Sequence, residues 1–284
     1  KKTVPADKAI TVRHLLTHTA GLCAVPEQAW LNRLMAAESP QDAQTTIGDF
    51  VDYYASLPLA FPPGEAWLYS RSTCVVGHLV EIISGQPLDA FFRERIFQPL
   101  QMTDTDFFVP EEKVARFAAA YGPTKNGLQR IDSPDTSSWF VRKPCPFFMG
   151  SGGLVSTVTD YCRFARMMLN KGEWQGKRLL QAETHALMTK NHTGDMPVPL
   201  AGPGMGFGLG YGVARRTRSA TGIPAPLKEV FPWSAGSYTW GGAFCTQHWI
   251  DPKEKIIGIL MTQVRPYFHL NLFADFVESV YLAL

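Results

Sequence analysis

The chain has 284 residues, enough for one large domain or two medium ones with a sizeable core. Its composition, 45% hydrophobic and 18% charged, is typical of globular proteins and excludes a disordered chain. The net charge of +2 and the lack of any basic run argue against a nucleic-acid partner, and no apolar stretch reaches the roughly 18 residues of a membrane span.

The cysteines indicate a reduced protein. They number five, which is odd, and they form neither a Cys-x-x-Cys pair nor a Cys/His ligand spacing. We expect most of them to be buried as small hydrophobic side chains, so cysteine use leans toward a cytoplasmic location without fixing the compartment. The five are Cys23, Cys74, Cys145, Cys162 and Cys245.

The first predicted helix follows Thr11, which has the side chain of an N-cap, and runs to His18 before Gly21 ends it. His14 and His18 are four residues apart and would share a face of this helix. A metal site would need a third ligand at suitable spacing, and none is evident. We therefore favour two structural histidines bonded to backbone, and we expect no metal and no cofactor.

A second helix is predicted over residues 72–84, with Gly85 as its stop. Tyr69 lies at the mouth of this helix, where backbone N–H groups point outward. The alternative for Tyr69 is a tyrosine packed on the core with its hydroxyl bonded. The expected buried stripe of the helix is Val75, Val76, Leu79, Val80 and Ile83.

The stretch 237–264 predicts two neighbouring strands joined by a turn at Asp251-Pro252. The second strand, over 256–261, is apolar enough to be buried on both faces. Paired glycines are unusual in a strand interior and mark either a bulge or a close approach of ligand or backbone. Gly241-Gly242, beside Trp240, therefore indicates either the wall of a substrate cleft or a β-bulge next to a core tryptophan.

Two regions follow from this pattern. Residues 1–205 are expected to be a mostly helical region that carries Tyr69, and residues 206–284 a sheet region that ends in a helix over about 269–284. The sequence leaves the oligomeric state open.

Several segments together resemble the superfamily of serine β-lactamases and penicillin-binding-protein-like hydrolases, and most of all its esterase branch near the class C β-lactamases. They occur in the family's order and cover most of the chain from residue 10 onward. The segments are 11–22, 64–88, 99–107, 150–180 and 238–263.

The resemblance implies an α+β fold, a mostly helical domain beside an antiparallel sheet flanked by helices. It also implies a catalytic set from three places: a Ser-x-x-Lys helix, a tyrosine motif and a motif on an edge strand. Tyr69 matches the tyrosine, and Trp240-Gly241-Gly242 matches the edge-strand motif in its esterase form. By analogy, the backbone N–H of Ala243 would help to hold the oxyanion.

The sequence departs from the family pattern at two points. Arg71 stands where the tyrosine motif often has Asn, which weakens a β-lactamase or peptidase interpretation. No serine of the chain has a lysine three residues later. In the family the Ser-x-x-Lys segment precedes the stretch matched by 11–22, so we expect the nucleophile and the first strands of the sheet to lie upstream of residue 1.

The implied function is that of a serine carboxylesterase that cleaves short-chain esters through an acyl-enzyme. A free phenol has a pKa of about 10, so Tyr69 would act as a base only beside a cation such as the family's lysine. Trp240 in place of a lysine favours neutral esters over β-lactams. The alternatives are a β-lactamase, D-amino-acid peptidase or acyltransferase on this scaffold, or a non-catalytic binding relative.

Overall fold

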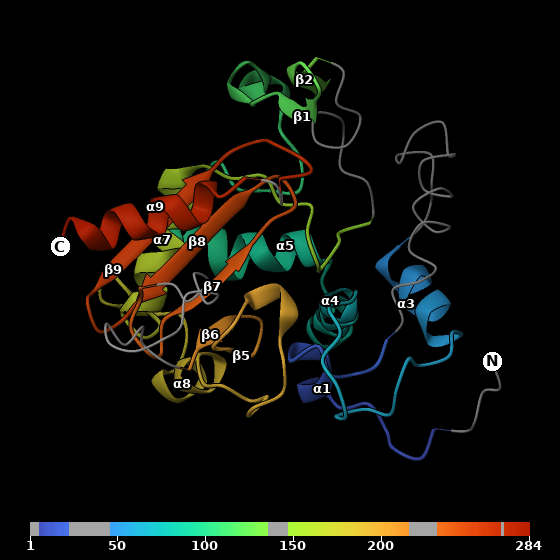
Figure 1. Cartoon of the computed structure of the whole chain (residues 1–284). Helices are drawn as coiled ribbons and strands as arrows, with labels where there is room; N and C mark the ends of the chain where they lie inside the picture. Colours follow the sequence, from blue (N-terminus) through green and yellow to red (C-terminus); the bar gives the residue numbers. More distant parts are fainter. Residues whose placement is uncertain (1–5, 23–45, 136–146, 216–231, 268–269) are drawn as a thin grey trace. The chain divides into compact units, whose positions relative to one another are not determined.

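The computed structural model describes residues 6–22, 46–135, 147–215, 232–267 and 270–284 (Figure 1). The chain forms two compact units, one from residues 1–117 and 134–157 and the other from residues 118–133 and 158–284. Each unit has its own hydrophobic clusters. Division by contacts therefore places residues 158–205 in the same unit as the sheet. The predicted regions were instead divided at residue 205, by their content of helix and strand.

The first unit is built from helices. Its clusters join α3 to Cys74 and Phe147, and α1 to one face of α4. The elements are α1 (Val12–Leu16), α3 (Ile47–Ala55), α4 (Ser72–Ser84), α5 (Leu88–Phe92), the π-helix η1 (Arg93–Phe97), α6 (Gln98–Leu100) and the 3-10 helix η2 (Glu111–Arg116).

The helix predicted to reach His18 ends earlier, at Leu16. Thr17 (φ −99°, ψ 2°) and His18 (φ 56°) both leave the helical region, so His14 and His18 do not share a helix face. Thr11 caps the helix as predicted. Its hydroxyl accepts from the His14 N–H, and the His14 ring nitrogen Nδ1 accepts from the Thr11 N–H, both at 3.2 Å.

Helix α4 has the predicted bounds, and Gly85 ends it in the left-handed conformation (φ 69°). Val75, Val76 and Leu79 pack on the α1 cluster as predicted. Ile83 was predicted to be buried and is 82% exposed. The most buried side of the helix carries small residues instead, because the Cα of Gly150 lies only 3.1 Å from the place that a β-carbon on Gly77 would occupy.

The second unit contains a five-stranded antiparallel sheet in the order β5-β6-β7-β8-β9. Together with the helices, it confirms the predicted α+β class. The sheet strands are β5 (Met205–Phe207), β6 (Gly212–Ala214), β7 (Tyr238–Gly241), β8 (Thr246–Asp251) and β9 (Ile256–Met261). The other elements are the hairpins β1 (Ala120–Thr124) with β2 (Gly127–Asp132) and β3 (Glu173–Trp174) with β4 (Lys177–Arg178), the helices α7 (Val158–Leu169), α8 (Ala182–Met188) and α9 (Leu272–Leu282), and the 3-10 helix η3 (Pro199–Ala201).

The stretch 237–251 was predicted to be one strand and forms two. The chain reverses between Gly242 and Cys245, where the Gly242 N–H donates to the Thr246 carbonyl and the Cys245 N–H to the Gly242 carbonyl. Cys245 takes a left-handed φ of 60° in this turn. The prediction that 256–261 is buried on both faces is also corrected: apart from Gly258, the residues of β9 are only half-buried.

Helices cover both faces of this sheet (Figure 1). Successive residues of a strand point to opposite faces. In β8, Trp249 packs on Phe273 and Phe276 of α9, whereas His248 packs on Tyr161 of α7. The sheet is therefore a middle layer, with α9 on the Trp249 face and α7 on the His248 face.

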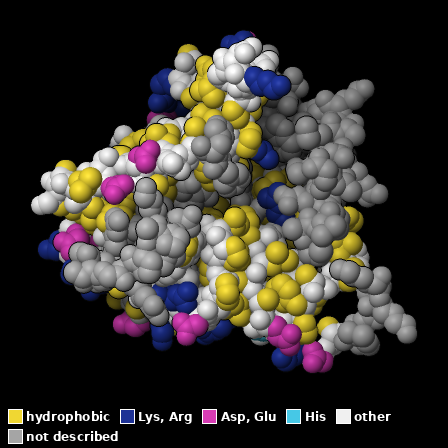
Figure 2. Space-filling view, viewed as in Figure 1, with side chains coloured by type: hydrophobic (Ala, Val, Ile, Leu, Met, Phe, Trp, Pro, Cys, Tyr) yellow, Lys and Arg dark blue, Asp and Glu magenta, His cyan; other side chains and the backbone are white. Residues whose placement is uncertain are grey.

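The surface mixes charges of both signs. On the face in Figure 2, Lys and Arg side chains lie among Asp and Glu rather than in one large patch. Among the helices that the structure describes, none is long and apolar enough to cross a bilayer. Cys74 and Cys245 are buried and Cys162 is half-buried, and all three are free thiols; Cys23 and Cys145 lie outside the described residues.

Candidate active site

Tyr69 lies immediately before α4, and the residues on both sides of it are fixed to His18. The Leu68 N–H donates to the His18 carbonyl at 2.9 Å, and the Ser70 N–H donates to His18 Nδ1 at 3.4 Å. The Ser70 hydroxyl in turn accepts from the Ser72 N–H at 3.3 Å and so satisfies a donor of the first turn of α4. Tyr69 itself is 37% exposed, so its ring reaches the surface rather than the core.

The Tyr69 ring belongs to an aromatic cluster. Its centroid lies 4.7 Å from that of His18 and 6.2 Å from that of Trp67, and the His18 and Trp67 rings meet edge to face at 5.9 Å. His18 is 2% exposed, and burial lowers the pKa of its imidazole to about 4. The ring is thus neutral near pH 7, and acceptance at Nδ1 assigns its proton to Nε2.

Arg71, the departure from the family's tyrosine motif, contacts the glycine-rich loop 150–153. Its Nη1 donates to the Ser151 hydroxyl at 3.0 Å and lies 3.5 Å from the Met149 sulfur. The same hydroxyl lies 3.0 Å from the Cys74 sulfur. Burial raises the pKa of the Cys74 thiol, which disfavours the nucleophilic thiolate. These contacts therefore connect the start of α4 to that loop.

Trp240 and Gly241 lie on the part of β7 that is paired on one side. Both pair with β8, opposite His248 and Gln247, whereas the register with β6 ends at Thr239. Trp240 and Gly241 therefore form the end of an inner strand of the sheet, next to the turn that leads into β8. The half-buried Trp240 ring meets the Phe207 ring edge to face at 5.1 Å.

The glycine pair belongs to a hairpin rather than to a bulge. Gly241 ends β7, and Gly242 begins the turn by donating its N–H to Thr246 at 2.6 Å. Ala243 is exposed, and its N–H donates to no acceptor within the described part of the chain. Of the two amides after Gly241, that of Ala243 is thus the one open to an oxyanion.

The predicted site residues fall in both units. Tyr69 belongs to the first, and Trp240, Gly241, Gly242 and Ala243 belong to the second. Within the second unit the structure brings the last four together at one hairpin. In the sequence, His18 was considered only as a possible metal ligand. Its bonds to the residues around Tyr69 could not be predicted there, because they join positions some 50 residues apart along the chain. Within the described residues, no group of three metal-ligating side chains occurs.

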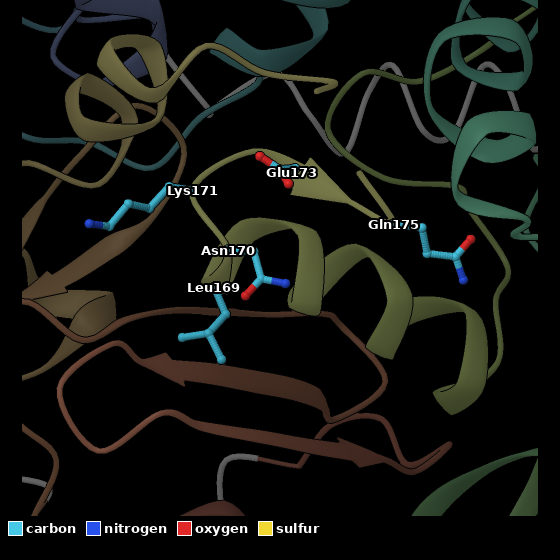
Figure 3. A pocket seen from close by; sticks show the side chains of 5 residues that line it. All are labelled: Leu169, Asn170, Lys171, Glu173 and Gln175. Atoms are coloured by element: carbon cyan, nitrogen blue, oxygen red, sulfur yellow. The ribbon is translucent and has the colours of Figure 1, made fainter. Parts of the chain in front are cut away.

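A hollow at the end of α7 contains none of the predicted site residues (Figure 3). Glu173, one of its charged side chains, pairs with Arg178 at 3.0 Å. The hollow therefore offers no arrangement that matches the predicted chemistry. Its lining residues are Leu169, Asn170, Lys171, Glu173 and Gln175.

The resemblance predicted a tyrosine motif and a Trp-Gly-Gly motif on an edge strand. Tyr69 lies just before α4, whereas β7, which carries Trp240 and Gly241, is an inner strand between β6 and β8. The family model described as Beta-lactamase matches residues 1–274 of the chain. The chain belongs to the Beta-lactamase family.

Protein Rv1367c of Mycobacterium tuberculosis is 32% identical over 276 residues, which cover 93% of this chain and 65% of the relative. Esterase EstB of Burkholderia gladioli is 28% identical over 283 residues, covering 90% and 65% of the two chains. The chain therefore spans about two thirds of the length of these curated relatives.

Solved structures confirm the β-lactamase-like fold. EstCE1, titled a hydrolase with promiscuous acyltransferase activity, superposes with a TM-score of 0.73 at 24% identity. The superposition covers 96% of this chain and 72% of that one. At this identity the likeness concerns the fold alone.

Proposed function

We propose that this chain is part of a serine carboxylesterase that cleaves short-chain esters through an acyl-enzyme. The observation that carries the proposal concerns Ala243, in the turn that follows Trp240-Gly241-Gly242. This residue is exposed, and its N–H donates to no acceptor among the described residues. Backbone N–H groups held in place before the reaction stabilise the oxyanion of acyl transfer. Membership of the Beta-lactamase family and the esterase name of the EstB relative support the same chemistry.

In the proposed reaction, a serine outside residues 1–284 attacks the ester carbonyl. Tyr69 accepts the serine proton, assisted by the lysine of a Ser-x-x-Lys motif, and passes a proton to the leaving alcohol. The N–H of the serine and that of Ala243 hold the oxyanion. Water then attacks the acyl-enzyme with Tyr69 again as the base, which restores the serine and releases the acid.

Trp240 and Gly241 would form the wall beside which the ester lies. Trp240 offers an apolar surface, because its ring is half-buried against Phe207 and carries no charge. A lysine there would attract a substrate carboxylate, whereas an indole has no such attraction. We therefore infer a preference for neutral esters over β-lactams and D-amino-acid peptides.

Acyl transfer to an alcohol is a second candidate. The acyl-enzyme of the proposed route can be opened by an alcohol in place of water, with Tyr69 taking the alcohol proton. The fold neighbour EstCE1 is a hydrolase with promiscuous acyltransferase activity. For this chain, the exposed position of Tyr69 is compatible with either acceptor.

The test uses the full-length protein that contains this chain. Rates are compared on p-nitrophenyl acetate and butyrate, nitrocefin and a D-alanine amide, and a fluorophosphonate adduct is located by peptide mass spectrometry. We expect the esters to be cleaved fastest. We also expect the fluorophosphonate to form one adduct, on the serine of a Ser-x-x-Lys motif outside residues 1–284. An adduct on a serine within this chain, or faster turnover of nitrocefin, would contradict the proposal. Added methanol or glycerol separates transfer from hydrolysis through the new ester formed.

A further inference from the structure

We propose that His18 is a positioning residue that sets the orientation of Tyr69; the inference rests on the proposed role of Tyr69 in proton transfer. His18 touches the tyrosine motif in three ways, through its carbonyl, its ring nitrogen and its ring face. None of these contacts uses the tyrosine hydroxyl. His18 therefore acts on Tyr69 through the backbone and the ring.

His18 holds the backbone on both sides of Tyr69. The Leu68 N–H donates to the His18 carbonyl and the Ser70 N–H to the His18 ring. One residue thus fixes the peptide groups before and after Tyr69. Because the Cα–Cβ direction follows from these peptide groups, the two bonds define where the Tyr69 ring leaves the chain.

A second feature is the backbone of His18 itself. Its φ of 56° places it in the left-handed region, which residues other than glycine rarely occupy, although Asn, Asp and His do so more often than the rest. A left-handed non-glycine residue persists only where its surroundings hold it, and such residues cluster at functional sites. Here the conformation turns both the carbonyl and the ring of His18 toward residues 68–70.

A third feature is the rigidity of the segment that presents His18. Residues 17–22 are all buried. Besides the bond to Leu68, the Gly64 N–H donates to the Thr19 carbonyl and the Ala60 N–H to the Gly21 carbonyl, both at 2.8 Å. The hydroxyls of Thr17 and Thr19 lie 2.8 Å apart. Residues 60–70 are therefore held along this buried segment by backbone hydrogen bonds.

The ring contact completes the argument. The Tyr69 ring is more than one third exposed, so the His18 ring at 4.7 Å and the Trp67 ring restrict it on its buried side. A reacting group that moves by about 1 Å costs on the order of 100-fold in rate. Removing His18 should therefore lower turnover even though His18 touches no reacting atom.

The test compares three variants of the full-length protein. His18→Ala removes the ring and its acceptor. His18→Asn keeps a left-handed residue, and its Oδ1 can replace Nδ1 as acceptor, but it removes the ring that packs on Tyr69. His14→Ala is the matched control: it also deletes a histidine whose Nδ1 accepts a backbone N–H, but His14 is half-buried in α1, and its bond goes to Thr11 rather than to residues 68–70.

Two readouts are used. The first is kcat and KM on p-nitrophenyl acetate, for which His18→Ala should lower kcat by about 10- to 100-fold with little change in KM. The second is the rate at which tetranitromethane nitrates Tyr69, followed by peptide mass spectrometry, which needs no activity. We expect His18→Ala to raise this rate severalfold, His18→Asn to give intermediate values of both, and His14→Ala to resemble the wild type.

The proposal is overturned by a wild-type kcat and nitration rate in His18→Ala, or by equal effects from His14→Ala. If His18→Ala does not fold, His18→Asn decides, because loss of the ring must still raise nitration of Tyr69 above the wild-type rate. If the wild type cleaves no ester, the proposed function fails, and the nitration rates still decide the role of His18.

Discussion

The side chain of Gln247 covers the α-carbon of Gly241, in the place that a β-carbon on Gly241 would occupy. The two residues are directly opposite in β7 and β8, and the Gln247 amide donates to the Tyr267 hydroxyl at 3.2 Å. A glycine at position 241 therefore leaves room for the Gln247 side chain to pack on the strand. A role in admitting substrate would come in addition to this packing role.

Gly241→Ala should force the Gln247 side chain aside and break its bond to Tyr267. Because the far end of a flexible side chain gives way, we expect the free energy of unfolding to fall by only about 1 kcal/mol, the value of one hydrogen bond. The measurement is a double-mutant cycle by urea denaturation with Gln247→Ala as the second change. In the Gln247→Ala background the alanine should cost almost nothing; an equal cost in both backgrounds would contradict the packing role.

Tyr69→Phe should abolish most of the ester hydrolysis and leave the fold intact. Loss of a general acid–base group costs about 100- to 10,000-fold in rate, whereas removal of a hydroxyl from a side chain that is 37% exposed costs little stability. The rate is measured on p-nitrophenyl acetate with the full-length protein. Tyr121→Phe, at a tyrosine that is 39% exposed, is the control and should retain the wild-type rate. Equal rates in the two variants would remove Tyr69 from the mechanism.

The sequence predicted the elements whose signals are local. The α4 helix was predicted from Ser72 to Ser84 because apolar periodicity and Gly85 mark its body and end. The capping side chain of Thr11 was predicted for the same reason, since the donor it satisfies is three residues away. Family order added the positions of Tyr69 and Trp240, which periodicity alone could not assign.

The misses have a common cause in tertiary contact. The end of α1 at Leu16 depends on bonds from residues 60–70 to the segment after it, and these are invisible to a window around His18. The turn at 242–245 was missed because it has no Asn-Gly or Asp-Gly signal and uses Cys245 in the left-handed region. Ile83 is exposed although it fits the helical stripe, because the close approach of Gly150 turns the Gly77 side of α4 inward.

Trp240→Lys should shift specificity toward substrates that carry a carboxylate. A charged donor at this end of β7 would pair with such a group, and hydrogen bonds to charged groups contribute about 1.5–3 kcal/mol, or roughly 10- to 100-fold in kcat/KM. The ratio of nitrocefin to p-nitrophenyl acetate turnover measures the shift. Trp240→Leu removes the indole without adding charge and should leave the ratio low. An unchanged ratio in Trp240→Lys would contradict the proposed preference for neutral esters.

Stability should rise between about pH 4 and pH 6.5 because of His248. Burial lowers the pKa of this imidazole to about 4, outweighing the opposing effect of the hydrogen bond that the ring makes to the Trp240 backbone, and the Tyr161 hydroxyl lies 3.2 Å from its Nδ1. The unfolded chain, with a histidine pKa of about 6.5, binds the proton more readily. The contribution of His248 to the free energy of unfolding is therefore fully present above about pH 6.5. It is lost as the pH falls toward 4, which lowers the free energy of unfolding by about 3 kcal/mol.

Urea denaturation across this range tests the prediction. His248→Gln cannot titrate, so its stability should depend less steeply on pH than that of the wild type, with the carboxylates contributing equally to both curves. His18, whose pKa burial also lowers to about 4, should contribute a second step of the same sign. Parallel curves for the wild type and His248→Gln would show that His248 is not held neutral in the folded protein.

Asp251 connects the end of β8 to α9. It is fully buried; its Oδ2 accepts from the Tyr281 hydroxyl at 2.6 Å and from the Ser234 N–H at 2.9 Å, and its Oδ1 accepts from the N–H groups of Lys253 and Glu254. Burial alone would raise the pKa of this carboxyl, but the hydrogen bonds lower it further than burial raises it. The carboxylate form is therefore the one that the fold stabilises, and its contribution is lost as the pH falls below the ordinary range of Asp.

Asp251→Asn should lower the free energy of unfolding by about 1–3 kcal/mol, because an amide NH₂ then faces at least one buried N–H donor. Tyr281→Phe removes one of the four bonds, a bond to a charged group, and should cost about 1.5–3 kcal/mol. Asp275→Asn changes an exposed carboxylate in the first turn of α9 and is the control, with an effect below about 1 kcal/mol. If Asp251→Asn were no more destabilising than Asp275→Asn, Asp251 would not be the residue that holds α9 to the sheet.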